Sequence, residues 1–177
     1  MAFRVEVRSL FDSLSASRTV SGEFVVPDIE LGQQPYRFDG PATFEVTLTN
    51  VGAGIIAQGT VNARVHTPCV RCLCETCVDI HADIDGFYVL PGHEDEIPEE
   101  QEYEIIEDGL TVDLEPALVQ TVVVELPFAP VHDAECKGIC PVCGADRNVM
   151  ECGCESPGTS SAFDVLKDLH LGDEGGA

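Results

Sequence analysis

Basic residues are scarce in this sequence: its 177 residues include only nine lysines and arginines, together with no tryptophan and two methionines. Because proteins hold nucleic acid largely through Lys and Arg at the phosphates, this scarcity argues against a general RNA-binding or DNA-binding protein. The chain carries 32 aspartates and glutamates, which leaves a formal net charge of −23. That charge suits a basic protein partner. An acidic surface that only keeps the protein soluble is an open alternative.

The sequence also lacks the signals of a membrane or secreted protein. It contains no run of about 18 apolar residues, and its first residues do not form a basic segment followed by an apolar one. No glycine-rich phosphate loop and no recognisable nucleophile motif occur. We therefore expect a cytoplasmic protein that contacts no membrane, is not an enzyme and takes no small-molecule substrate.

Alternation of apolar and polar residues predicts most of the fold. It indicates strands over residues 3–7, 19–26, 42–49, 55–65 and 78–90. The Gly-Ala-Gly sequence at 52–54 predicts the turn of a hairpin between the third and fourth of these strands. The Pro-rich and Glu-rich residues 91–102 predict an exposed loop, and residues 103–106 a return to strand.

One longer helix is predicted over residues 113–126. Asp113 suits an N-cap, Pro116 the first turn, and Pro127 the stop. An apolar stripe runs along it, made of Leu114, Leu118, Val122 and Leu126. The β-branched residues 121–124 leave a strand as the competing interpretation. A short second helix is expected over residues 161–169.

These elements predict an α+β fold, mostly an antiparallel sheet, with one longer helix and a small C-terminal zinc-bound segment. Closure of the sheet into a barrel is left open. We expect two parts: a β-rich domain over residues 1–130, with the helix near its end, and a zinc-binding segment over residues 131–177 that ends in the short helix.

The nine cysteines indicate metal binding, because disulfides are rare in a reducing cytoplasm. Residues 140–144 read Cys-Pro-Val-Cys-Gly, the form of a zinc knuckle, in which two thiolates converge on one ion and the glycine permits the tight turn. Two more thiols follow closely, so a complete structural site is predicted from Cys140, Cys143, Cys152 and Cys154.

A second site is predicted from residues far apart in the sequence. Cys69 and Cys72 have the same spacing and form half a site, and Cys136 and His132 are the ligands left to complete it. A mixed partition, with the thiols at 69, 72, 140 and 143 in one site, is the alternative. Cys74 and Cys77 are unplaced: they are strand residues with one thiol buried, a third metal half-site or a reversible dithiol.

Several of these motifs together resemble the bacterial YceD family, also called DUF177. The resemblance rests on Cys-Val-Arg-Cys-Leu at 69–73, the helix start at 113–114, Leu-Pro at 126–127, Pro-Val-His at 130–132, and the cysteine-rich element from 136 to 154. It implies a role in the accumulation or processing of large-subunit ribosomal RNA. The residues that match the family's elements are Cys69, Arg71, Cys72, Cys136, Cys140, Cys143, Asn148, Cys152 and Cys154.

The resemblance also bears on the metal sites. Shorter relatives in the family keep the equivalents of Cys69, Cys72, His132 and Cys136 but lack the later cysteines, which favours the two-site partition. Cys74 and Cys77 depart from the family pattern, as does Arg147, where the family tends to have leucine.

Three functions are compatible with these observations. In the first, a non-enzymatic factor with one or two structural Zn²⁺ ions supports large-subunit ribosomal RNA accumulation, processing or assembly, and its acidic surface contacts a basic ribosomal protein or the large-subunit precursor. In the second, the zinc knuckles bind RNA directly, which needs a local basic patch of Arg71, Lys137 and Arg147. In the third, a pair of cysteines forms a redox dithiol. We expect the first, because it accounts for both charge and cysteines.

Overall fold

The computed structural model describes residues 3–106 and 110–154. The predicted short helix over 161–169 lies outside these residues. The described elements are β1 (Arg4–Glu6), η1 (Arg8–Asp12), β2 (Ser17–Phe24), β3 (Ile29–Leu31), β4 (Gln34–Phe38), β5 (Ala42–Asn50), β6 (Gly54–Pro68), β7 (Glu75–Val89), η2 (Glu94–Glu96), β8 (Glu104–Ile105), β9 (Thr111–Asp113) and α1 (Glu115–Val124), where η denotes a 3₁₀ helix.

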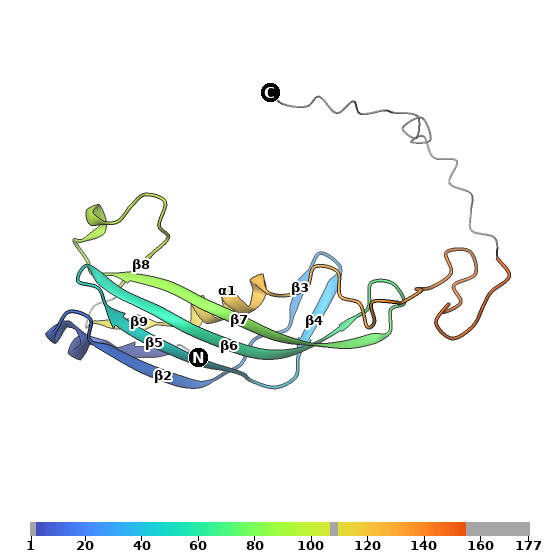
Figure 1. The fold of residues 1–177 in the computed structure, drawn as a ribbon, viewed down its shortest axis with the longest axis horizontal. Coiled ribbons are helices and arrows are strands. Elements are labelled where there is room, and N and C mark those ends of the chain that lie inside the picture. Colours follow the sequence, from blue (N-terminus) through green and yellow to red (C-terminus); the bar gives the residue numbers. More distant parts are fainter. Residues whose placement is uncertain (1–2, 107–109, 155–177) are drawn as a thin grey trace, which may run out of the picture.

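A long antiparallel hairpin of β6 and β7 forms the axis of the molecule (Figure 1). Both strands have 15 residues and pair along their whole length, from Gly54 opposite Val89 to Pro68 opposite Glu75. On the other edge of β6, β5 pairs with its first half and β4 with residues nearer its end. The sheet continues outward through β2 beside β5, β3 beside β4, and β8 beside β7.

The described sheet is open, and its strands do not close into the barrel that the sequence left as an alternative. Among the described strands, β2 pairs only with β5 at one side, and β8 pairs only with β7 at the other. The sheet is mostly antiparallel, as predicted, with β8 as a parallel exception. After the predicted loop, β8 lies beside the last residues of β7 and runs in the same direction, with Glu104 opposite Tyr88 and Ile105 opposite Val89.

The predicted hairpin over residues 42–65 is confirmed, with β5 and β6 paired from Thr43 opposite Asn62 to Asn50 opposite Ile55. Three short strands, β3, β4 and β9, were not predicted. β4 contains Pro35 and follows a glycine turn, so its local sequence favours a loop. Its place in the sheet comes from packing instead, because Tyr36 is buried.

Helix α1 covers the sheet over β7 and β6. The strand alternative for residues 121–124 is wrong, because these residues form the end of α1. The whole predicted stripe of α1 and its flanks is buried, namely Leu114, Leu118, Val122 and Leu126. The helix is shorter than predicted and its N-cap is Leu114. Asp113 belongs to β9, although its Oδ1 still accepts a hydrogen bond from the backbone N–H of Glu115 at 3.0 Å. Among the described residues, no helix has the length and hydrophobicity to cross a membrane.

The clusters of buried hydrophobic residues become smaller toward the tip of the long hairpin. The main cluster lies between α1 and the sheet, and a smaller one, containing Tyr36, Val65 and Ile80, lies farther along β6 and β7. The hydroxyl of Tyr36 donates a 2.6 Å hydrogen bond to the carbonyl of Pro127 and so ties the segment after α1 to β4. A third cluster, of Cys69, Cys72 and Cys136, continues this series at the tip.

Truncation of Leu118 should test the packing of α1 on the sheet. Leu118→Ala removes a fully buried side chain, and we expect the free energy of unfolding in urea to fall by about 2 to 5 kcal/mol. Val124→Ala is the matched control on the same helix, because Val124 is 73% exposed, and it should cost less than about 0.5 kcal/mol. Equal losses for the two variants would contradict the placement of α1.

Candidate metal centres

The six residues that connect β6 to β7 form a tight turn with three cysteines, two of which, Cys69 and Cys72, are candidate ligands. The N–H of Cys69 donates to the carbonyl of Cys74 at 2.8 Å, and the N–H of Leu73 donates to the carbonyl of Cys69 at 2.9 Å. Leu73 has φ 62°, in the left-handed region that leucine rarely adopts. The cysteine motif therefore lies at the tip of the β6–β7 hairpin.

The same turn recurs at residues 140–145. The N–H of Cys140 donates to the carbonyl of Ala145 at 2.8 Å, and the N–H of Gly144 donates to the carbonyl of Cys140 at 2.9 Å. Gly144 has φ 74° and occupies the position that Leu73 has in the first turn. Each turn therefore folds a Cys-x-x-Cys pair in the same way, which is the local arrangement that a tetrahedral metal site requires.

The segment after α1 wraps around the first turn and carries its other two candidate ligands. The N–H of Val70 donates to the carbonyl of Pro130, and the N–H of Ile139 donates to the carbonyl of Arg71, both at 2.9 Å. The Arg71 guanidinium donates from Nη1 to the carbonyl of Cys136 at 3.0 Å and to that of Ala134 at 3.2 Å. These bonds hold residues 130–139 against the hairpin tip.

Four side chains converge there, and they are the predicted set Cys69, Cys72, His132 and Cys136, with ligand atoms within 4.8 Å of one another. The sulfurs of Cys69 and Cys136 are 3.9 Å apart, and the sulfur of Cys72 lies 3.3 Å from Nδ1 of His132. The three cysteines are buried and the histidine is exposed. This cluster could hold a metal ion.

The thiols of the first cluster influence one another's protonation. Burial opposes ionisation of Cys69, but hydrogen bonds from His132 and from the backbone at Cys72 and Arg71 outweigh it and lower the pKa of Cys69 to about 5. The pKa of Cys72 is raised, first by its hydrogen bond with Cys74, and the pKa of Cys136 is raised, first by burial. One thiolate therefore forms readily, and a metal ion would displace protons from the other thiols.

A second group of four ligand atoms also lies within 4.8 Å, and its members are Cys140, Cys143, Cys152 and Cys154. Hydrogen bonds from the backbone of Cys143 and Val142 lower the pKa of Cys140 to about 6. The pKa of Cys154 is raised to about 12, first by its hydrogen bond with Cys143. This cluster is more open than the first. Of its four cysteines only Cys140 is buried, and Cys143 is exposed.

Asn148 and Gly138 connect the two clusters, and neither is predicted to do so from the sequence. Asn148 accepts a 2.8 Å hydrogen bond from the N–H of Lys137, and its Nδ2 lies 3.5 Å from the sulfur of Cys136. Gly138 has φ 71°, and a Cβ at this position would lie 2.9 Å from the carbonyl oxygen of Arg71. For Gly138, the available signal is a glycine two residues after a candidate ligand. Asn148 matches the family's C-terminal element, but the match does not indicate its contact with Cys136.

The remaining predicted residues lie beside these clusters. Cys74 lies 3.1 Å, sulfur to sulfur, from Cys72, and Cys77 is on β7 opposite His66. Both thiols are exposed, so the expectation that one is buried is wrong. Within the described residues, neither thiol belongs to a group of three or more candidate ligands.

Comparison with known proteins relates the chain to one family. The sequence model of the family described as "Large ribosomal RNA subunit accumulation protein YceD" matches residues 57–170. The chain is 30% identical over 105 residues to the uncharacterized protein ML1660 of Mycobacterium leprae, which is 59% of this chain and 48% of that protein. It is 34% identical over 101 residues to the uncharacterized protein Rv2926c of Mycobacterium tuberculosis, which is 56% of this chain and 48% of that protein.

The chain therefore spans about half the length of the curated relatives that it matches. No solved structure is similar to it. The matched residues 57–170 include both cysteine clusters, α1 and all of the β6–β7 hairpin except residues 54–56.

Metal stoichiometry of single and double variants should distinguish the two partitions of the cysteines. With two separate sites, Cys69→Ser and Cys143→Ser should each lose one of two bound metal ions, because serine is a poor ligand for a metal that cysteine thiolates bind. The C69S/C143S variant should lose both ions, and C69S/C136S only one. The ions are counted by mass spectrometry after loading and desalting. Retention of one ion by C69S/C143S would favour the mixed partition.

Removal of the Arg71 side chain should loosen the first cluster. Arg71→Ala deletes the two hydrogen bonds to the carbonyls of residues 134 and 136, and we expect a loss of about 1 to 3 kcal/mol in unfolding free energy. Metal should also pass to a chelator faster. Lys137→Ala is the matched control, because Lys137 is exposed beside the same cluster. Similar behaviour of the two variants would contradict a structural role for Arg71.

Proposed function

The chain belongs to the YceD family of large ribosomal RNA subunit accumulation proteins, and from this premise we propose that it is a non-enzymatic factor for large-subunit ribosomal RNA accumulation and assembly. The observation that carries the proposal is that the family match and the two ligand clusters coincide in one part of the chain. A cytoplasmic location, as expected from the sequence, is consistent with this role.

We propose zinc as the metal of both clusters. Three cysteines with one histidine, and four cysteines, are the ligand sets of structural zinc sites. Four protein ligands leave no open position for a substrate, so each ion would stabilise the fold and would take no part in a reaction. The first ion would join Cys72 to His132, which are 60 residues apart in the sequence, and so add to the folding free energy by closing a long loop.

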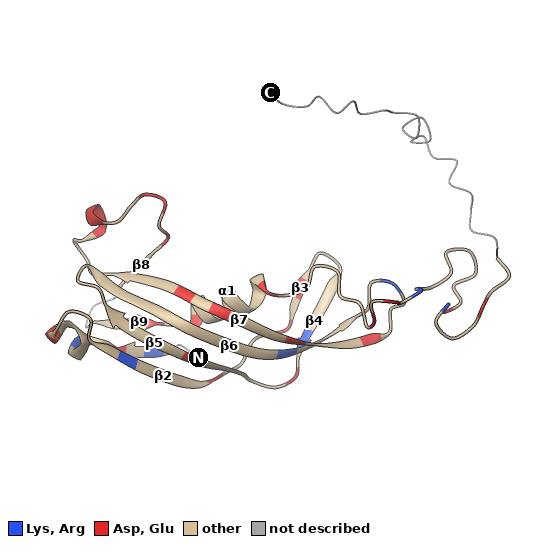
Figure 2. Ribbon diagram, in the orientation of Figure 1, with Lys and Arg blue, Asp and Glu red and all other residues tan. Residues whose placement is uncertain are grey.

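The acidic charge supports a protein contact in this role. With a net charge of −23, the surface repels phosphates and attracts Lys and Arg. Ribosomal precursors contain basic proteins as well as RNA, so the proposed partner is a basic ribosomal protein or the precursor that carries it. Figure 2 shows acidic residues along β7 and on the loop that leads to β8.

Direct RNA binding through the knuckles is the second candidate. Lys137 and Arg147 are exposed beside the clusters and support it. Arg71 supports it less, because its Nη1 already donates to two backbone carbonyls. Salt-dependent RNA binding by the zinc-loaded protein that is lost in a K137A/R147A variant would favour this candidate over the first.

Complementation should test the proposed function. In cells that lack this chain, we expect the ratio of large-subunit to small-subunit ribosomal RNA to fall. Wild type and Cys77→Ser should restore it, because Cys77 lies outside both clusters. The C69S/C136S variant should not restore it, because it lacks the first site. The ratio is read from total RNA on a gel, with protein levels matched by blotting. An unchanged ratio in the deletion would contradict the proposal.

A further inference from the structure

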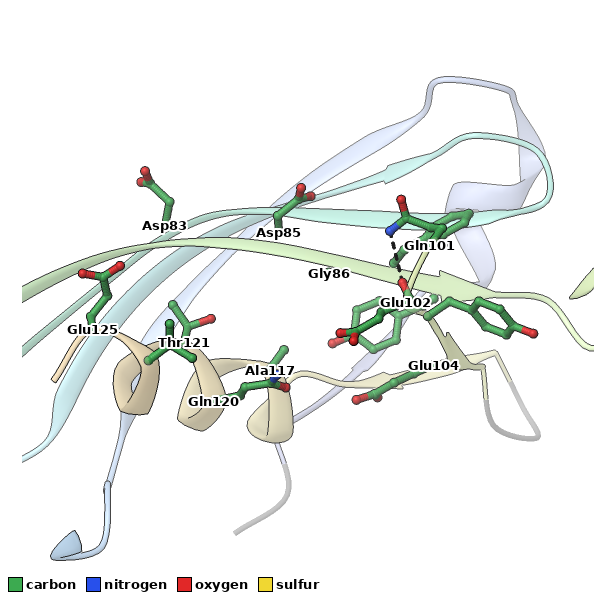
Figure 3. Close-up of a pocket in the computed structure, with 14 residues that line it drawn as sticks. Asp83, Asp85, Gly86, Gln101, Glu102, Glu104, Ala117, Gln120, Thr121 and Glu125 are labelled. Carbon is green, nitrogen blue, oxygen red and sulfur yellow. Dashed lines mark hydrogen bonds between the residues drawn. The ribbon is translucent and has the colours of Figure 1, made fainter. Parts of the chain in front are cut away.

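A groove of about 620 Å³ lies between β7 and α1 (Figure 3). It is lined by the second half of β7, away from the hairpin tip. β7 forms one wall, α1 the other, and residues 101–104 close one end (Figure 3). Its size is within the roughly 300 to 1,000 Å³ of ordinary ligand pockets. None of the residues that line it is Lys or Arg, and five are carboxylates: Asp83, Asp85, Glu102, Glu104 and Glu125.

The five carboxylates form no ion pair with a basic residue in the part of the chain that the structure describes. Within residues 3–106 and 110–154, the ion pairs all involve other acidic residues, such as Asp79 with Arg64 and Asp113 with Arg4. Burial, and after it the charge of Asp113, raises the pKa of Glu104, as expected for a carboxylate that faces no cation. A cationic ligand would therefore relieve repulsion that the fold leaves in place.

The carboxylates are too far apart for a metal ion. Groups of three or more candidate ligands that converge within 4.8 Å occur, in the described residues, only in the two cysteine clusters. The acidic residues of the groove instead follow its length, from Glu125 near one end to Glu102 and Glu104 at the other (Figure 3). This spacing suits a ligand that carries several positive charges along an extended backbone.

The other walls suit the side chains of such a ligand. Tyr103, which is 39% exposed, and Phe87 contribute aromatic rings, over which a guanidinium group can stack. Gly86 and Ala117 are small and leave room between the walls. From residue 117 to residue 125 the helix rises about 12 Å, which is the length of about four residues of extended chain.

We propose that this groove binds a short extended segment of a partner protein that is rich in Arg and Lys. The groove's size, its unpaired carboxylates and its aromatic rings carry the proposal. Only the identity of the partner, a basic ribosomal protein, rests on the proposed function.

Binding of a labelled peptide to the full zinc-loaded chain tests the groove without the ribosome. The probe is a fluorescein-labelled peptide of about six residues in which Arg alternates with Gly, followed by anisotropy at physiological salt. We expect D83N/D85N/E104Q to bind about tenfold more weakly, because three groove charges are lost. E23Q/E30Q/E45Q is the matched control: it removes the same charge from exposed positions on β2, β3 and β5 and should bind like wild type.

A second variant, Gln120→Lys, places a cation in the groove at an exposed helix position and should also weaken binding. Equal weakening by the control variant would overturn the proposal, because binding would then follow net charge alone. Absence of peptide binding by wild type, equal competition by spermine, or a dimer that the groove variants disrupt would also overturn it. Groove-dependent binding together with an unchanged ribosomal RNA ratio in the deletion would instead retain the groove and reject the ribosomal role.

Discussion

Convergence of ligands from distant parts of the chain is the constraint on which the first cluster depends. Cys69 and Cys72 lie on a hairpin tip. In the sequence, His132 and Cys136 come after β7, the loop, β9 and α1. Hydrogen bonds of Val70 and Arg71 to the later segment bring the two halves together. The sheet, the direction of α1 and the Tyr36 contact with Pro127 all determine where that segment runs.

Features that depend on local sequence were the ones that could be predicted. The stripe from Leu114 to Leu126 has helical spacing, and all four of its residues are buried. The ligand sets came from Cys-x-x-Cys spacing and, for the first set, from the family resemblance, and the geometry brings both sets together. Each of these depends on residues close in sequence or on a recurrent motif.

Features decided by tertiary packing could not be predicted in the same way. β4 contains a proline and joins the sheet through the buried Tyr36. The parallel direction of β8 depends on the course of the loop before it. Asn148 reaches Cys136 from an Asx turn whose partner is Asp146, a contact that no spacing rule indicates. The groove likewise combines β7, β8 and α1, so its carboxylates meet only in the folded chain.

The length of the β6–β7 hairpin has a geometric consequence. Asp85 of the groove and Glu75 at the start of β7 are ten residues apart on one continuous strand, a separation of about 33 Å at the usual rise of an extended strand. The strand is paired throughout, so this separation is held by a continuous hydrogen-bond ladder. The hairpin therefore holds the acidic groove and the cysteine-rich tip at a fixed separation, which is comparable to the diameter of a small domain.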